Sequence, residues 1–157
     1  MDYKSLMQQA ISLAKVAAVK GDVPVGALVV DDAGTILGMG ANLREQDNDP
    51  TAHAEIVAIR NAASKIGNYR LDDLTLVVTL EPCGMCAGAI VQTRLKRLVF
   101  STFNFNQGAV GSNHDLIRDS RSLRTIEVVS GVLENESNEL IKHFFLSQRS
   151  QEEQKNF

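Results

Sequence analysis

Apolar residues recur along the chain with two periods, one typical of helices and one typical of strands. Helical spacing of apolar residues predicts a helix over residues 3–20, which Gly21 ends in the position of a C-terminal cap. Short apolar runs predict strands over residues 25–30 and 35–41, with a turn at 31–34 between them. The first part of the chain is therefore expected to form one helix and a β-hairpin.

The next segment is polar and then becomes helical. Residues 42–50 show no periodicity and predict a loop, while residues 52–66 predict a helix. Pro50 suits the first helical turn, and Asp49 or Thr51 could cap it. The face of this helix that packs on the core is expected to carry Ile56, Ile59, Ala63 and Ile66.

Strands and helices alternate over the rest of the chain. Apolar runs predict strands at residues 74–80, 96–102 and 125–130. The other expected elements are a helix over residues 83–93, a loop over 103–113, a short helix over 115–119, a helix over 133–147 and a frayed polar tail over 148–157. This order implies one layered α/β domain over residues 1–157, whose mixed sheet joins a hairpin to parallel strands crossed by helices.

Composition and charge narrow the class of protein. A chain of 157 residues with 44% hydrophobic and 22% charged residues is typical of one globular domain. Its net charge of -3 provides no bulk attraction to nucleic acid, so such binding would need a local basic patch. Two cysteines do not make a disulfide framework, and we see neither a targeting segment nor an apolar run long enough to span a membrane. We therefore expect a cytoplasmic protein.

Two short stretches of the sequence carry side chains that can bind a metal. His53 is followed two residues later by Glu55, and Pro82 precedes Cys83 and Cys86 at the C-x-x-C spacing. One imidazole and two thiolates are ligands that zinc prefers, and three protein ligands leave the fourth tetrahedral position open for water. H-x-E followed by P-C-x-x-C is the signature of zinc-dependent deaminases, in which the glutamate is not a ligand but carries protons. The pattern predicts a catalytic zinc site at the starts of two helices.

Simpler interpretations of these residues exist. C-x-x-C alone could be a redox dithiol or half of a four-cysteine zinc site, but further cysteines are lacking and a dithiol leaves His53 and Glu55 unexplained. Glu55 could merely complement the helix dipole, although zinc hydrolysis needs a proton carrier beside the water. We interpret Glu81 as structural, and His114 and His143 have no partner motif.

The residues around these motifs resemble the bacterial tRNA-specific adenosine deaminases. The matching stretches are Asp22–Ala27, Asn42, Asp49–Glu55, Tyr69–Leu71, Thr79–Ala89, Gly108–Ser112 and the pair Phe144–Phe145. The resemblance covers the chain from the first helix to about residue 146. It implies conversion of adenosine to inosine at the wobble position of a tRNA anticodon, by a homodimer that holds one Zn²⁺ per subunit. It also implies a three-layer α-β-α cytidine-deaminase-like fold, with a mixed five-stranded central sheet flanked by helices.

The resemblance also implies roles for individual residues. Asn42 would contact the bound nucleotide, and the backbone around Ala54 and Pro82 would shape the base pocket. Phe144 and Phe145 would help place the C-terminal helix near the anticodon loop.

Two features depart from the family pattern, and both lie where the resemblance implies contact with RNA. The loop after the fourth predicted strand, residues 104–107, carries neither an acidic residue nor a lysine, and residues 146–149 contain one cation. These features favour the alternative of a small-molecule deaminase that acts on guanine, cytosine or a free nucleoside, whereas the motif matches favour tRNA. A non-catalytic zinc or dithiol module is a third alternative.

Overall fold

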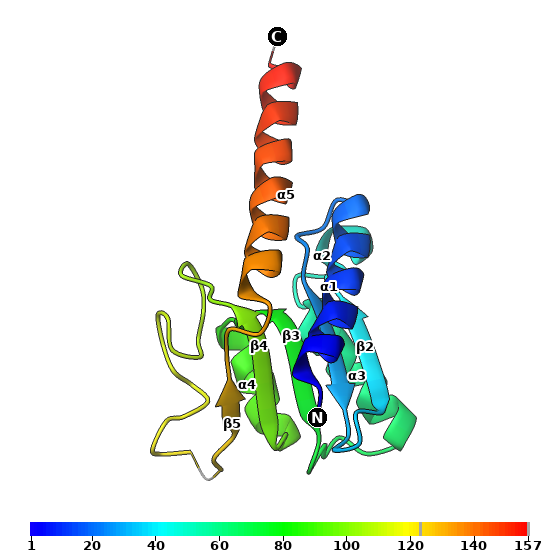
Figure 1. Cartoon of the computed structure of the whole chain (residues 1–157), viewed down its shortest axis with the longest axis vertical. Coiled ribbons are helices and arrows are strands. Elements are labelled where there is room, and N and C mark those ends of the chain that lie inside the picture. The colour runs from blue at the N-terminus through cyan, green and yellow to red at the C-terminus, as the bar shows by residue number, and fades with distance from the viewer. Residues whose placement is uncertain (123, 157) are drawn as a thin grey trace.

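The computed structural model describes residues 1–122 and 124–156. In chain order its elements are α1 (Tyr3–Val19), β1 (Gly26–Val30), β2 (Ile36–Ala41), α2 (Arg44–Asp47), α3 (Ala54–Ile66), β3 (Thr75–Leu80), α4 (Gly84–Thr93), β4 (Arg97–Thr102), β5 (Glu127–Val129) and α5 (Glu134–Lys155). The strands form one five-stranded sheet in the order β2-β1-β3-β4-β5 (Figure 1). Strand β1 pairs antiparallel with β2 and β3, whereas β3, β4 and β5 are parallel. The predicted hairpin and the mixed sheet are confirmed.

Helices cover both faces of the sheet. One hydrophobic cluster joins the sheet to α3 and α4, and a second joins it to α1 and the beginning of α5. The central strands are apolar on both faces, and every residue of β1 is buried. Figure 1 shows α1 and α5 on one side of the sheet and α3 and α4 on the other. The three-layer α-β-α arrangement is therefore confirmed.

Helix α3 rests on β2 through two glycines. A Cβ atom on Gly38 would lie 2.3 Å from the carbonyl oxygen of Ala58, and one on Gly40 would lie 2.3 Å from that of Ala54. The backbone of the helix therefore lies directly on the backbone of the strand, which only glycine permits. This close approach requires small side chains on the helix, and the expected core face is confirmed at Ile59 and Ala63 but not at Ile56 and Ile66. The buried residues are Ala54, Glu55, Ala58, Ile59 and Ala62, whereas Ile56 and Ala63 are half-buried and Ile66 is exposed.

The connections differ from the sequence prediction at three places. The segment expected as a loop contains α2, which ends at Asn48 with a left-handed φ of 49°. Helix α3 begins after His53, not at residue 52, and the carboxylate of Asp49 accepts bonds from the amide and hydroxyl of Thr51 instead of capping a helix. No helix is present at residues 115–119, where the carboxylate of Asp115 accepts a bond from the Arg118 amide.

Helix α5 is longer than predicted. It continues to Lys155, so the expected frayed tail is wrong over residues 148–155, while residue 157 lies outside the described residues. Only Ser137 of this helix is buried, and the second half projects away from the body of the protein (Figure 1). The glutamines, glutamates and lysine in its last turns are strong helix formers, which explains its length without tertiary packing. Among the described residues, none of the helices is both long and apolar enough to span a membrane.

Candidate active site

Two helix N-termini meet beside the central strand β3 and bring three potential metal ligands together. His53 is the N-cap residue of α3, and Cys83 is the N-cap residue of α4. The Nδ1 atom of His53 lies 3.6 Å from the sulfur of Cys83 and 3.5 Å from that of Cys86. The three ligand atoms lie within 4.8 Å of one another, so the structure assembles the predicted group.

The distances fit a tetrahedral zinc ion. Zinc bonds of about 2.3 Å to sulfur and about 2.0–2.1 Å to nitrogen place neighbouring ligand atoms about 3.6 Å apart. The two measured nitrogen–sulfur distances, 3.6 and 3.5 Å, agree with that value. A set of one nitrogen and two sulfurs also suits zinc chemically. The group can therefore hold one zinc ion and leave one position for a non-protein ligand.

The electrostatics of the group favour a thiolate. The pKa of Cys83 is lowered to about 3, chiefly by a hydrogen bond from Cys86 and further by one from His53. The pKa of Cys86 is raised, because its proton is held between the two sulfurs and because the side chain is buried. The N-terminus of α4 also favours negative charge at this point. The surroundings of Cys83 therefore favour the thiolate form, which is the form that binds a metal.

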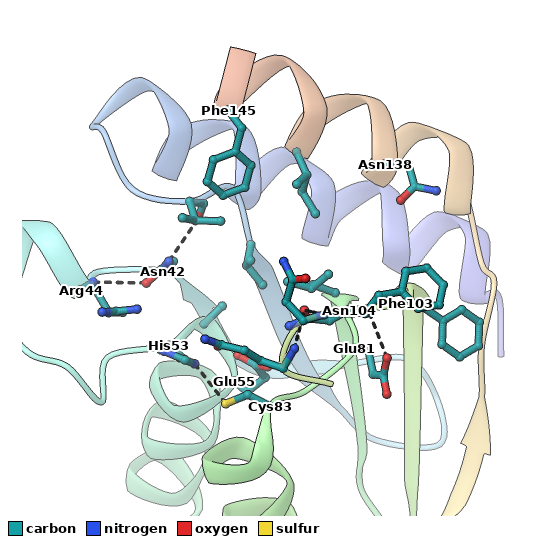
Figure 2. Close-up of a pocket in the computed structure, with 18 residues that line it drawn as sticks. Asn42, Arg44, His53, Glu55, Glu81, Cys83, Phe103, Asn104, Asn138 and Phe145 are labelled. Atoms are coloured by element: carbon teal, nitrogen blue, oxygen red, sulfur yellow. Dashed lines mark hydrogen bonds between the residues drawn. The ribbon is translucent and has the colours of Figure 1, made fainter. Parts of the chain in front are cut away.

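Glu55 lies in the first turn of α3 and faces the same space. Its side chain is buried, and burial raises its pKa to about 7, which the neighbouring His53 partly opposes. Figure 2 shows Glu55 beside His53 and Cys83, and all three line the same pocket. A carboxyl group in such surroundings can both accept and release a proton near neutral pH.

This pocket is a cavity of about 530 Å³. Its described lining residues are Val23, Val25, Asn42, Arg44, His53, Ala54, Glu55, Leu80, Glu81, Cys83, Phe103, Asn104, Phe105, Asn106, Gln107, Asn138, Ile141 and Phe145. The volume and the mixture of apolar and polar walls are typical of sites for small ligands or single bases. The loop after β2 forms one side, the loop after β4 forms another, and α5 crosses the top (Figure 2).

The structure brings some of the expected substrate-binding residues to this cavity and leaves others outside its lining. Asn42, Ala54 and Phe145 line it, whereas Pro82 and Phe144 do not. Phe144 instead meets Phe145 edge to face, with ring centroids 5.4 Å apart.

Asn42 lies at the edge of the cavity, whereas the two remaining histidines lie away from the metal group. The amide of Asn42 donates to the carbonyl of Val23 and accepts from the amide of Arg44, so it joins the two segments at the cavity's edge (Figure 2). His114 and His143 are exposed and do not belong to the metal group.

Sequence reasoning placed the 104–107 loop where RNA would be touched but did not identify it as a wall of the cavity. Phe103, Arg44, and the α5 residues Asn138 and Ile141 were not expected there. A signal for α5 was present, because Asn138, Ile141 and Phe145 are spaced three and four residues apart and so share one helical face. For the loop no periodic signal exists, since its residues reach the cavity only through tertiary folding.

Glu81 explains how that loop is held. Its buried carboxylate accepts bonds from the backbone amides of Val110 (2.9 Å) and Ser112 (3.1 Å) through one oxygen and from Asn104 (2.9 Å) through the other. The carbonyl of Pro82 accepts a further bond from Ala109, at 2.9 Å. These contacts agree with our interpretation of Glu81 as a structural residue. Its partners are backbone amides of the loop after β4 and not of its own segment. The loop is thereby joined to the segment that carries Cys83.

Comparison with known proteins agrees with this geometry. The model of the family described as the cytidine and deoxycytidylate deaminase zinc-binding region matches residues 1–102. A tRNA-specific adenosine deaminase of Haemophilus influenzae is 49% identical over 148 residues, which cover 94% of this chain and 86% of the relative. A chain from a structural study of A-to-I editing by tRNA:A34 deaminases at the wobble position of transfer RNA has a TM-score of 0.81 and 39% identity, covering 85% of this chain and 96% of that one.

Deaminases of free bases share the fold as well. A guanine deaminase from Bacillus subtilis is 40% identical but covers only 66% of this chain and 66% of its own, with a TM-score of 0.62. A guanine deaminase from Nitrosomonas europaea covers 90% of this chain with a TM-score of 0.79 but at 22% identity, so high sequence identity over most of the chain, and not coverage alone, distinguishes the tRNA-specific relatives.

Proposed function

The chain belongs to the tRNA-specific adenosine deaminases of the cytidine and deoxycytidylate deaminase family, and on that premise we propose that it converts adenosine to inosine at the wobble position of tRNA anticodons. The observation that carries the proposal is the meeting of a zinc-binding group, a buried carboxyl group and a base-sized cavity at the N-termini of α3 and α4. The reaction is hydrolytic, with water entering at C6 of the base and ammonia leaving.

His53, Cys83 and Cys86 would hold the zinc ion, which when bound would make a water molecule acidic enough to act as the nucleophile near neutral pH. Glu55 takes a proton from that water and transfers it to N1 of the adenine ring. Glu55 then takes the proton of the hydroxyl group now on C6 and delivers it to the amino group, so that the bond from C6 to nitrogen breaks, the C6 carbonyl forms and ammonia leaves. The apolar side chains of Val25 and Leu80 line the same cavity and help to exclude bulk water from these transfers.

The substrate must bring its base to a recessed metal group. A base in a single-stranded anticodon loop reaches such a site at a smaller cost in stacking energy than a base within a duplex. Asn42 and the first turn of α3 at Ala54 line the cavity beside the metal group. We assign them to orientation of the base, and Phe145 to the position of α5 above it.

A small-molecule deaminase is the second candidate, and two observations favour it. The chain has a net charge of -3, and Arg44 is the only cation among the described lining residues. Positively charged surface attracts the phosphates of a polynucleotide. A free guanine, cytosine or nucleoside has no phosphates and would require little such surface.

We also propose that the protein works in the cytoplasm as a homodimer. The resemblance to the tRNA-specific enzymes supports both assignments. Large exposed apolar side chains such as Met39, Ile66 and Met85 provide surface that a second copy could cover. Sedimentation of the zinc-loaded protein should give twice the mass of the chain, and a monomer across micromolar concentrations would refute the dimer.

The decisive experiment compares substrates directly. Zinc-loaded protein is incubated with an anticodon stem-loop that bears adenosine at the wobble position, and in parallel with guanine, cytosine, adenosine and cytidine. Inosine in the RNA and no ammonia from the small molecules is the expected result. Ammonia from a free base or nucleoside, with none from the RNA, would establish the second candidate.

Two variants separate the assigned roles. Glu55→Gln should retain zinc and lose turnover, because the proton carrier is removed while the ligands remain. His53→Ala should lose zinc and activity together. The exposed Glu45→Gln serves as the control for a change of charge, and Glu55→Gln with near-normal turnover would contradict the role of Glu55.

A further inference from the structure

Three phenylalanines form a ladder from the core to the edge of the active-site cavity. Phe100 is fully buried, and Phe103 meets it edge to face, with ring centroids 5.2 Å apart and planes at 86°. Phe105 stacks on Phe103 at 6.1 Å and 26°, yet it remains 77% exposed. The last ring is therefore supported from beneath and leaves most of its surface free beside the cavity that it lines.

The loop that carries Phe105 is held in place by backbone bonds. The side-chain amide of Asn113 donates to the carbonyl of Phe105 at 2.8 Å. The side-chain oxygen of Asn104 accepts bonds from the amides of Asn106 (3.3 Å) and Gln107 (3.1 Å), and Glu81 holds the Asn104 amide. Such bonds fix the ring before a ligand arrives, so little ordering entropy remains to oppose binding.

The surroundings of the ring favour stacking over ion pairing. Arg44 is the only cation among the described residues that line the cavity, and the two carboxyl groups there, Glu55 and Glu81, are buried. Beside Phe105, the exposed side chains of Asn106 and Gln107 carry amides that can donate to and accept from base edges. A free aromatic face with amides next to it is the chemistry that proteins use for unstacked bases of single-stranded RNA.

We propose that Phe105 is a stacking platform for one base of the substrate RNA, a neighbour of the adenosine that enters the cavity. The proposal rests on the proposed function and adds a specificity-determining residue to it. Stacking of one base on an aromatic side chain is lost on substitution by alanine, which corresponds to a rise in KM of about 5- to 150-fold. Because the ring is outside the metal group, kcat should stay at its original value.

The first test is a cycle of protein and RNA changes. Wild type and Phe105→Ala are assayed for KM and kcat on the anticodon stem-loop and on versions in which each nucleotide flanking the adenosine is abasic. We expect the KM effect of Phe105→Ala to disappear on one of the abasic RNAs, because the stacking partner is already absent there. Val19→Ala is the matched control, since it trims another exposed apolar side chain that does not line the cavity and is not among those assigned to the dimer surface.

A second test uses fluorescence and does not depend on turnover. The sequence contains no tryptophan, so Phe105→Trp introduces a single reporter at the platform. In the inactive Glu55→Gln background, binding of the stem-loop should quench this tryptophan, and the abasic RNA identified in the first test should not.

The outcomes distinguish this inference from the proposed function. RNA turnover by wild type with an unchanged KM for Phe105→Ala would overturn the platform alone. An equal rise in KM on every RNA, or quenching that persists with all abasic RNAs, would also overturn it, since a general effect of the loop would explain the data. Absence of inosine from every RNA with wild type would overturn both.

Discussion

Replacement of Glu81 by alanine tests the physical account of the cavity wall. The side chain is 1% exposed, and its carboxylate is the shared acceptor for the amides of Asn104, Val110 and Ser112. Glu81→Ala removes that acceptor and leaves three donors without a protein partner. The loop after β4 then keeps the bond from the Ala109 amide to the Pro82 carbonyl but loses the three bonds to the carboxylate at the end of β3.

The magnitude follows from the number of donors. An unsatisfied buried donor costs about 1–3 kcal/mol, and water that enters the vacated space keeps the value near the lower limit. Three donors therefore lower the free energy of unfolding by about 3 kcal/mol. For a chain of this size, each kcal/mol lowers Tm by about 2–4 °C, so Tm should fall by about 6–12 °C.

The assay measures Tm by calorimetry on protein of matched zinc content, together with hydrogen exchange of the loop amides. Glu127→Ala is the control, because that carboxylate is 55% exposed and pairs with Arg97 at 2.8 Å on the surface. An exposed pair of this kind contributes about 1 kcal/mol or less. The amides of Asn104, Val110 and Ser112 should exchange faster only in the Glu81 variant.

A conservative variant sharpens the test. Glu81→Gln keeps the oxygen that serves Val110 and Ser112 but sets an amide nitrogen opposite the Asn104 N–H. One bond is lost, so Tm should fall by about a third as much as in Glu81→Ala. If Glu81→Ala is no less stable than the Glu127 control, or if the loop amides remain protected, then another contact holds this loop and the reasoning fails.

Three other perturbations follow from the structure. Gly40→Ala forces β2 away from α3, so it should lower the free energy of unfolding by about 1–3 kcal/mol and cause loss of zinc. Gly88→Ala is the control: space is open at that glycine, so its Tm should not fall. If Arg44 binds one phosphate of the RNA, Arg44→Ala should reduce the slope of log Kd against log salt by about 0.7. Titration of the stem-loop at several salt concentrations measures the slope, and an unchanged slope would contradict phosphate binding by Arg44. Removal of zinc by a chelator should make both Cys83 and Cys86 reactive toward a thiol reagent, and thiols that react equally before treatment would argue against their role as ligands.

The sequence predicted those parts of the protein whose signal is local. The hairpin, the buried strands and the helices after His53 and Cys83 follow from periodicity, turns and caps, and they were confirmed. The metal group could be predicted because each of its two motifs lies at a helix N-terminus beside β3.

The parts of the prediction that were wrong or missing concern features that depend on tertiary contacts. The apolar spacing on α3 placed Ile59 correctly in the core but was wrong for Ile56 and Ile66, because the close approach of Gly38 and Gly40 selects alanines at the contact with β2. The partners of Glu81 lie 23 to 31 residues further along the chain, so no local pattern could assign them. The 104–107 loop was expected to touch RNA, but its position as a wall of the cavity depends on those bonds and was missed for the same reason.

The contact of α3 with β2 has a consequence for how this enzyme tolerates change. Because strand backbone supports helix backbone there, the height of His53 and Glu55 above the sheet does not depend on which side chains fill the rest of the core. Core substitutions away from the two glycines should lower the yield of folded protein while each zinc-loaded molecule keeps its specific activity. In a mutant library, total activity should then report the amount of folded protein, whereas changes in activity per molecule should map to the glycines, the metal group and the cavity wall.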